Sequence, residues 1–251
     1  MGRYTCQTER LTLTMMRQVN DSVSRRFSHR PFSESGSVGV CFTDLDRQQT
    51  DMAQLSWLST DEHAKAARFK SPLQRQRFIA GRVFSRRVLS KVTGLAPENL
   101  EIIKDQCGKP SLNPVAVGGR LRSKGLLKFN LSHSENFLCI ATAIGRDVGI
   151  DIEVVNPDLD ILAISQASLD QEDNEQVQCA SPNERSLVFY RLWTRREAFA
   201  KMLGHGVNSD HVHLTPAARW SLRSLEFIVE EKQIVSSLAI AAPATASAND
   251  F

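Results

Sequence analysis

The chain has few cysteines, and those it has are scattered. Five occur in 251 residues, an odd number, and no two of them form a C-x-x-C pair. They are Cys6, Cys41, Cys107, Cys139 and Cys179. Disulfide frameworks and structural zinc sites need paired or clustered cysteines, so neither is predicted. We therefore expect reduced thiols and a cytoplasmic protein.

Long apolar runs are also missing. No segment approaches the length that spans a bilayer, and the first thirty residues lack the apolar centre of a secretory signal. Basic residues alternate there with Ser and Thr, as in an organellar presequence, but Glu9 and Asp21 argue against one. We expect no membrane association, a poorly ordered N-terminal extension over residues 1–36, and a flexible tail over residues 243–251.

One long stretch of the chain lacks acidic residues, and another lacks basic residues. No acidic residue lies between Glu62 and Glu98, and no Lys or Arg lies between Asp151 and Glu184. The basic stretch contains Lys65, Arg68, Lys70, Arg75, Arg77, Arg82, Arg86, Arg87 and Lys91. Taken alone, these stretches are typical of a solvated helix face and of polar loops. Together they also fit a phosphate-binding half followed by a metal-binding half.

Several segments have the signatures of helices. Ser59 with Glu62 predicts a capping box that opens a helix ending near residue 69. Periodic apolar residues predict a second helix over 73–93, which Gly94 would end, and a third over 183–202, ended by Gly204. One or two further helices are expected within 160–180.

Apolar runs predict the strands. Residues 129–144 indicate an extended segment, a turn at 134–136 and a buried strand, and residues 147–155 indicate another strand. Residues 225–231 and 234–242 are expected to form a closing hairpin. The pattern predicts an α+β protein built of two similar α/β halves, residues 37–145 and 146–242.

Two carboxylates stand out on the strand near residue 150. Alternate residues of a strand share a face, so Asp151 and Glu153 point one way, and Ile150 and Ile152 the other. Paired carboxylates repel each other unless a cation compensates, and oxygen ligands without clustered His or Cys favour Mg²⁺. The alternative is an exposed strand edge. Glu197 would add a third ligand if its helix packs across the strand.

The helix over 183–202 carries a stripe of three residues spaced by four. Trp193, Glu197 and Lys201 lie nearly above one another on this helix. One interpretation is a core tryptophan beside an ordinary surface ion pair, worth a few tenths of a kcal/mol. The other is a functional stripe that faces a metal-bound phosphate.

A phosphate ligand would explain further residues. Magnesium usually binds through a few carboxylates and substrate phosphates. Lys65, Arg77 and Lys109 could then hold phosphate groups while Lys201 approaches the same ligand from its helix. His133 alone is typical of a core or surface histidine, but beside Ser132 at a strand end it is a candidate phosphate donor.

Four short motifs resemble one known family. "CGKP" at 107–110, "FNLSHS" at 129–134, "VGIDIE" at 148–153 and "WTRREAFAK" at 193–201 occur in the order and spacing of 4'-phosphopantetheinyl transferases of the surfactin-synthetase-activating (Sfp) type. The resemblance covers residues 58–207. It implies a pseudo-twofold fold of two halves that acts as a monomer. It also implies transfer of the 4'-phosphopantetheine arm of coenzyme A to a serine of an apo acyl or peptidyl carrier protein, releasing adenosine 3',5'-bisphosphate.

The resemblance also implies roles for single residues. Asp151, Glu153 and Glu197 would hold Mg²⁺ against the pyrophosphate, and Glu197 would take the proton of the carrier serine. Lys201 would neutralise the leaving group. The remaining ligands of coenzyme A would be Lys65, Arg77, Gly108, Lys109, Pro110, Ser132, His133 and Asp151.

Other interpretations stay open. Arg196 stands where the family commonly has Lys, and arginine cannot give up a proton at neutral pH. The protein could be an inactive relative that binds carriers, or another Mg²⁺-dependent phosphoryl-transfer enzyme. The basic stretch could bind nucleic acid. Against this, Phe69, Phe78 and Phe84 are expected in the core rather than as exposed stacking residues, so we expect no nucleic-acid partner.

Overall fold

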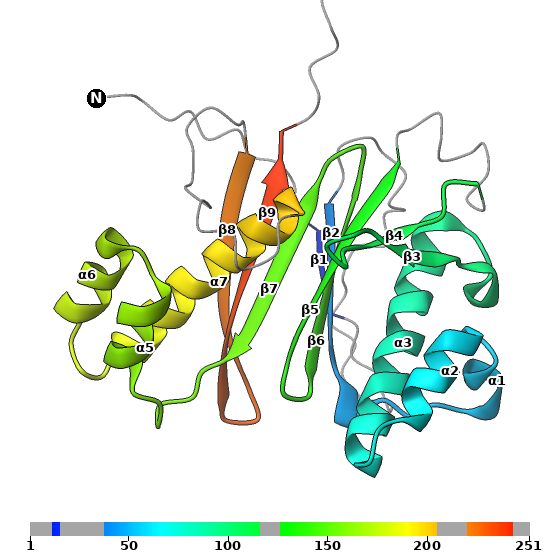
Figure 1. Ribbon diagram of the computed structural model, residues 1–251, viewed down its shortest axis with the longest axis horizontal. Coiled ribbons are helices and arrows are strands. Elements are labelled where there is room, and N and C mark those ends of the chain that lie inside the picture. The colour runs from blue at the N-terminus through cyan, green and yellow to red at the C-terminus, as the bar shows by residue number, and fades with distance from the viewer. Residues whose placement is uncertain (1–11, 16–37, 116–125, 205–219, 243–251) are drawn as a thin grey trace, which may run out of the picture.

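The computed structural model describes residues 12–15, 38–115, 126–204 and 220–242 (Figure 1). Its strands are β1 (Thr12–Met15), β2 (Val38–Asp44), β3 (Ile102–Lys104), β4 (Pro110–Leu112), β5 (Leu127–Ser134), β6 (Phe137–Ile144), β7 (Val148–Val154), β8 (Trp220–Val229) and β9 (Lys232–Ala241). Its helices are η1 (Leu45–Arg47), α1 (Met52–Leu55), α2 (Thr60–Ala67), α3 (Pro72–Thr93), η2 (Pro97–Asn99), α5 (Ile161–Ser168), α6 (Gln171–Cys179) and α7 (Arg185–Leu203).

The first half is a sheet in the order β1-β2-β6-β5, with α3 packed on one face. Helix α2 begins with the predicted capping box of Ser59 and Glu62. Helix α3 begins after the cap Ser71 with Pro72 in its first turn, where a missing N–H costs nothing. It ends at Gly94, whose φ of 76° is left-handed, as predicted. The fully buried Phe84 and Leu89 of α3 anchor it to the sheet.

The second half is a sheet in the order β7-β9-β8, covered on one face by α7. Helix α7 ends at Gly204, as the sequence predicts, and α5 and α6 pack near its start. Strands β8 and β9 form the predicted hairpin, in register from Trp220 to Val229. Its two-residue turn consists of Glu230 and Glu231, which both have positive φ.

The two sheets pack against each other and share one apolar core. Phe137 of β6 contributes to it together with Ile150 and Ile152 of β7 and Ile240 of β9. The layers therefore run α3, first sheet, second sheet, α7 (Figure 1). The predicted mixture of helix and sheet is confirmed, whereas the pseudo-twofold relation of the halves stays a prediction.

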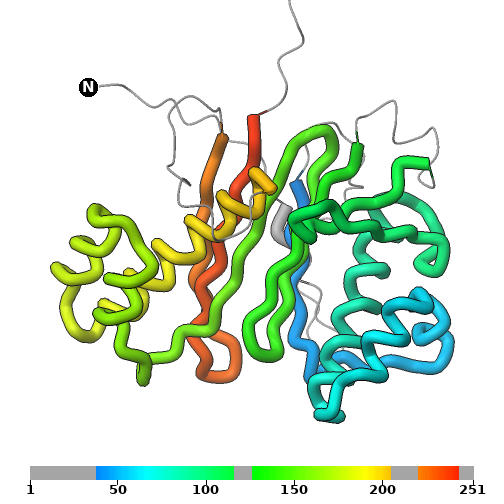
Figure 2. Tube along the Cα trace, in the orientation of Figure 1, coloured from blue at the N-terminus to red at the C-terminus, as the bar shows by residue number. Residues whose placement is uncertain are grey.

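Edge strands β5 and β7 lie side by side where the two sheets meet, as the chain trace also shows (Figure 2). We call this junction the seam. The seam matters because it brings the FNLSHS motif of one half against the VGIDIE motif of the other.

Two sequence predictions concern the ends of the chain. Residues 12–15, which fall in the predicted N-terminal extension, form β1 and pair in parallel with β2. An open edge of β2 accepts this strand, so these four residues are not structureless. The rest of that extension and the predicted tail over 243–251 lie outside the described residues. Among the described helices, none is long and apolar enough to cross a membrane.

Candidate active site at the seam

Strand β7 presents its two carboxylates toward α7. Ile150 and Ile152 point into the core between the sheets, as the alternation predicts. Asp151 and Glu153 point the other way, and Asp151 is only 2% exposed. The pleat of one strand thus separates an apolar face from an acidic one.

Gly149 allows α7 to come this close to β7. A Cβ atom at Gly149 would lie 2.0 Å from the carbonyl oxygen of Ala198 and 2.3 Å from the backbone nitrogen of Met202. No side chain larger than hydrogen fits there, so helix and strand touch backbone to backbone. This contact brings the third carboxylate, Glu197, and the ammonium of Lys201 over the acidic face.

Lys201 joins the two halves through a small polar network. Its Nζ donates to Asp151 Oδ1 at 2.5 Å and to Ser132 Oγ at 3.0 Å. Ser132 Oγ donates in turn to the same Asp151 oxygen at 2.7 Å. Ser132, predicted to touch phosphate, is therefore buried in this network, because alternate residues of β5 face the seam. The structure brings Ser132, Asp151 and Lys201 together.

Two more residues of β5 reach across the seam. Asn130 Oδ1 accepts a hydrogen bond from the backbone N–H of Ile150 at 3.0 Å. Ser134 Oγ donates to Glu153 Oε2 at 2.7 Å and accepts from the N–H of Val154 at 3.1 Å. Residue numbers rise together on the two strands, so β5 and β7 run parallel, joined by side chains.

Burial raises the pKa of all three acids, Asp151, Glu153 and Glu197. It raises the pKa of Glu153 to about 7, with the charges of Asp151 and Glu197 adding to the effect. Burial also raises the pKa of Asp151, against the pull of Lys201 and Ser132, and that of Glu197. A second cation at this face would offset the cost of holding three carboxylates together.

The donor set fits a hard divalent cation. All candidate ligands are oxygens, and Asp151 Oδ2 is buried without a hydrogen-bond partner. Within the described ranges, however, no three His, Cys, Asp or Glu side chains already form a metal-binding group. Magnesium needs only one or two carboxylates when phosphates complete its shell. The three-ligand site of Asp151, Glu153 and Glu197 therefore stays a prediction.

The three residues of the stripe on α7 lie in different surroundings. Trp193 lies behind the site, half-buried in the cluster around α5 and α6, and stacks on Phe189 with centroids 6.2 Å apart. Glu197 is 8% exposed, and its pKa responds to both Asp151 and Lys201. Lys201 is bound to Asp151 rather than to Glu197. An ordinary surface pair between Glu197 and Lys201 is thus not what the structure shows.

A cleft lies at the C-terminal end of α7. The carboxylate of Asp105 accepts from the N–H groups of Cys107 and Lys109, and Gly108 between them has a φ of 82°. Lys109 Nζ donates to the carbonyl of Met202 at 2.8 Å. Lys109 and Pro110 line this cleft of about 320 Å³ together with Lys128, Asp147 and Met202 to Gly204. The CGKP motif and the end of α7 therefore meet, as a nucleotide-binding cleft would need.

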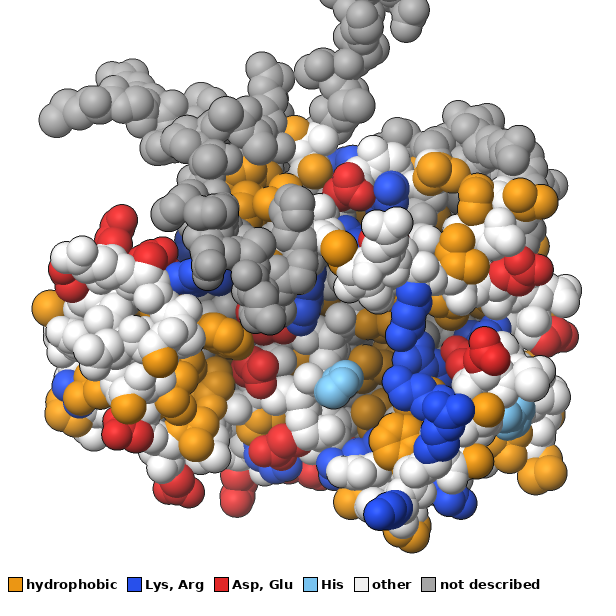
Figure 3. All heavy atoms as spheres, viewed as in Figure 1, with side chains coloured by type: hydrophobic (Ala, Val, Ile, Leu, Met, Phe, Trp, Pro, Cys, Tyr) orange, Lys and Arg blue, Asp and Glu red, His pale blue; other side chains and the backbone are white. Residues whose placement is uncertain are grey.

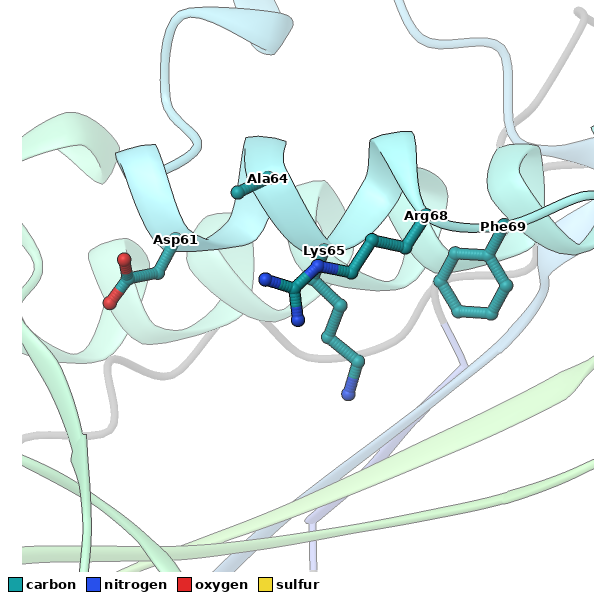
Figure 4. Close-up of a pocket in the computed structure, with 5 residues that line it drawn as sticks. All are labelled: Asp61, Ala64, Lys65, Arg68 and Phe69. Atoms are coloured by element: carbon teal, nitrogen blue, oxygen red, sulfur yellow. The ribbon is translucent and has the colours of Figure 1, made fainter.

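Lys65 belongs to another hollow, of about 570 Å³, on α2 (Figure 4). Asp61, Ala64, Arg68 and Phe69 line it as well. Figure 4 shows Lys65 extending away from the helix with the guanidinium of Arg68 beside its stem. The ammonium lies 5.4 Å from the centre of the Phe78 ring. Lys65 is exposed, and it lines a different hollow from the cleft at the end of α7.

Arg77 is engaged elsewhere. Its guanidinium donates to both oxygens of Asp46, at 2.7 and 2.6 Å, and this pairing lowers the pKa of Asp46. The guanidinium that the sequence analysis predicts to bind phosphate is therefore paired with a carboxylate through two hydrogen bonds. The role of Arg77 as a phosphate ligand stays a prediction, because Asp46 already engages its Nε and one Nη.

His133 and Arg196 flank the site without joining its network. His133 is exposed, because it stands between Ser132 and Ser134 on the opposite face of β5. Arg196 donates to Asp170, the N-cap residue of α6, at 3.3 Å. The arginine that replaces the usual lysine therefore ties α7 to α6.

The basic stretch does not form one free surface. Arg86 is buried, donates to Glu62 at 2.8 Å and also binds the carbonyls of Pro97 and Leu100. On the face that Figure 3 shows, Lys and Arg side chains gather beside the helices of the first half. Of the three phenylalanines expected in the core, Phe84 is buried, whereas Phe69 and Phe78 are half-buried. None of the three is an exposed stacking residue.

Three residues that hold the seam and α7 together, Asn130, Ser134 and Gly149, were not among the predicted residues. The signal for the first two was the alternation in N-x-S-x-S, which puts Asn130, Ser132 and Ser134 on one face of a strand. Gly149 gave a weaker signal, a glycine inside a strand, which often marks close approach of another backbone.

Comparisons with known proteins agree with this architecture. Residues 47–145 match the family described as 4'-phosphopantetheinyl transferase, N-terminal, and residues 147–242 match the 4'-phosphopantetheinyl transferase superfamily. The 4'-phosphopantetheinyl transferase HetI of Nostoc sp. is 32% identical over 82% of this chain and 89% of its own. The 4'-phosphopantetheinyl transferase AcpT of Salmonella typhimurium is 28% identical over 62% of this chain and 74% of its own. A 4'-phosphopantetheinyl transferase of Bacillus subtilis is 25% identical over 60% of this chain and 62% of its own.

The chain belongs to the 4'-phosphopantetheinyl transferase family and is an enzyme of that class. The relatives support transfer of phosphopantetheine to carrier proteins as its activity. The boundary between the two family matches falls at Arg146, between β6 and β7. The seam therefore joins the two matched regions.

Proposed function

We propose that this protein is a transferase of the surfactin-synthetase-activating type, which moves the 4'-phosphopantetheine arm of coenzyme A to a serine of an apo acyl or peptidyl carrier protein. One observation carries the proposal. Lys201 forms an ion pair at 2.5 Å with the buried Asp151, next to Glu153 and Glu197, where the two halves meet. Such a site can hold a cation and a pyrophosphate together.

Glu197 and Lys201 would carry the proton transfer and the charge. Glu197 would accept the proton of the carrier serine as its oxygen bonds to the phosphorus of the pantetheine phosphate. The bond from phosphorus to the bridging oxygen then breaks, and Lys201 would neutralise or protonate the departing adenosine 3',5'-bisphosphate. A carboxylate bound to Mg²⁺ is a weaker base than a free one. The position of Glu197 would therefore contribute much of the rate.

Asp151, Glu153 and Glu197 would hold Mg²⁺. When bound, the ion supplies neutralisation of the pyrophosphate oxygens. The unpartnered Asp151 Oδ2 supports this assignment. So does the rise in the pKa of all three acids, because a cation would favour their ionised forms.

The other ligands would bind the nucleotide of coenzyme A. Lys109 and Pro110 would line its cleft at the end of α7, and Gly108 lies in the turn just before them. His133 and Lys65 would contact the 3'-phosphate, and Arg77 would help through the N–H groups that Asp46 does not engage. We further predict a cytoplasmic monomer that binds no nucleic acid.

The test is the intact mass of an apo carrier protein after incubation with this enzyme, coenzyme A and Mg²⁺. We expect the carrier to gain one phosphopantetheine group, and we expect EDTA to prevent the gain. A carrier whose acceptor serine is replaced by alanine is the control. If several unrelated carriers gained nothing, the protein would be an inactive relative.

A further inference from the structure

Ser134, in the first half, hydrogen bonds to Glu153 in the second. Its hydroxyl donates to Glu153 Oε2 at 2.7 Å and accepts from the N–H of Val154 at 3.1 Å. Ser134 ends β5, and Glu153 is the last acid of β7. One hydroxyl thus binds both the side chain of Glu153 and the backbone of the next residue.

The direction of both bonds follows from the donors that are present when Glu153 is ionised. A backbone N–H can only donate, so Ser134 Oγ must be the acceptor toward Val154. A serine hydroxyl has a single proton, and the ionised carboxylate of Glu153 can only accept it. This donation engages Oε2 and restricts rotation of the carboxyl group. Among the described residues, none hydrogen bonds to the other oxygen, Oε1.

The same strand provides a comparison. Asn130 also crosses the seam, and its Oδ1 accepts from the N–H of Ile150 at 3.0 Å. Unlike Ser134, Asn130 makes no hydrogen bond to a carboxylate within the part of the chain that the structure describes. Loss of Asn130 would therefore weaken the seam, whereas loss of Ser134 would weaken the seam and also free Glu153.

We propose that Ser134 is a positioning residue that holds Glu153 for a divalent cation, so that the first half helps to build the metal site of the second. This inference rests on the proposed function, which makes Glu153 a metal ligand. Residues that orient metal ligands typically change metal affinity by about 10- to 100-fold when they are removed.

The test measures the affinity of the purified full chain for Mn²⁺, followed by the electron paramagnetic resonance of the free ion, with coenzyme A present throughout. We expect Ser134→Ala to bind Mn²⁺ about 10- to 100-fold more weakly than the unsubstituted chain. Ser134→Thr keeps the hydroxyl and should restore the affinity. Asn130→Ala should lower thermal stability while the Mn²⁺ affinity stays unchanged.

Two results would overturn the inference and leave the proposed function intact. One is unchanged Mn²⁺ affinity in Ser134→Ala while Asp151→Asn loses binding. The other is an equal loss in Asn130→Ala, which would make the effect one of the seam as a whole. If Asp151→Asn bound Mn²⁺ as the unsubstituted chain does, the proposed metal site itself would be wrong, and the inference with it.

Discussion

Gly149 of β7 and Ala198 of α7 meet backbone to backbone, and a Cβ atom on the glycine would lie 2.0 Å from the alanine carbonyl oxygen. Neither partner in this contact can move without moving its whole element. The closeness of α7 to β7, and with it the pairing of Lys201 with Asp151, therefore depends on a residue with no side chain.

We expect Gly149→Ala to lower the free energy of unfolding by about 1–3 kcal/mol and to reduce activity, because the added methyl group pushes α7 off β7. Denaturant unfolding measures the first effect and carrier modification the second. Gly81→Ala is the matched control. Its methyl group would lie 3.6 Å from Leu138, an ordinary contact, inside a helix that favours alanine. Equal stability of the two variants would contradict the proposed contact.

Glu197→Gln should reduce kcat/KM by about 100-fold or more while the fold persists, because the amide cannot accept the proton of the carrier serine. Burial raises the pKa of Glu197, so removing its charge should not destabilise the metal-free protein. Circular dichroism and initial rates of carrier modification test the two expectations. Glu226→Gln, which breaks the exposed pair with Arg191, should leave the rate nearly unchanged.

Lys201→Met should destabilise the EDTA-treated protein by about 3 kcal/mol, because Asp151 would keep a buried charge without a cation. Asp151→Asn in the same chain should recover part of that loss. A double-mutant cycle of unfolding free energies measures the coupling between the two residues. Strictly additive effects would show that the pair contributes nothing to stability.

Glu231→Gly should raise the free energy of unfolding by about 0.5–1 kcal/mol, because Glu231 has a φ of 68° in the two-residue turn between β8 and β9. The neighbouring Glu230 keeps its ion pair with Arg47. Gln233→Gly, in the extended strand β9, is the control and should lower stability instead. Thermal unfolding of both variants tests the backbone argument.

The buried thiols should resist modification. Burial raises the pKa of Cys41 to about 11 and that of Cys139 to about 12, whereas Cys107 and Cys179 are exposed. The thiolate is the reactive form, and in both buried thiols it grows only as the pH approaches these values. In a Cys6→Ser chain at pH 8, Ellman's reagent should label the two exposed thiols quickly and the others only after unfolding. Rapid labelling of all four would contradict the buried positions.

Local patterns in the sequence predicted much of the site. Alternation on a strand placed Asp151 and Glu153 on one face, and spacing by four placed Glu197 and Lys201 on one helix. These are properties of a single element, which the sequence displays directly. The helix caps at Ser59, Gly94 and Gly204 are local for the same reason.

Contacts between distant elements were not predictable in this way. Arg77 binds Asp46, thirty-one positions away, and nothing in the basic stretch indicates that partner. Ser132 and Ser134 form bonds to β7 only because two edge strands of different sheets lie together. Periodicity shows which face a residue occupies, but not which element covers that face.

The seam also constrains the lengths of β5 and β7, because each crossing side chain must lie on the correct face of its strand. Side chains of β5 alternate between its two faces, so deletion of one residue between Asn130 and Ser134 would turn at least one of the crossing side chains away from β7. The same holds for β7 between Ile150 and Val154. Insertions can be absorbed in the turns that flank these strands but not within them. The two strands therefore constrain each other in length, although no backbone ladder joins them.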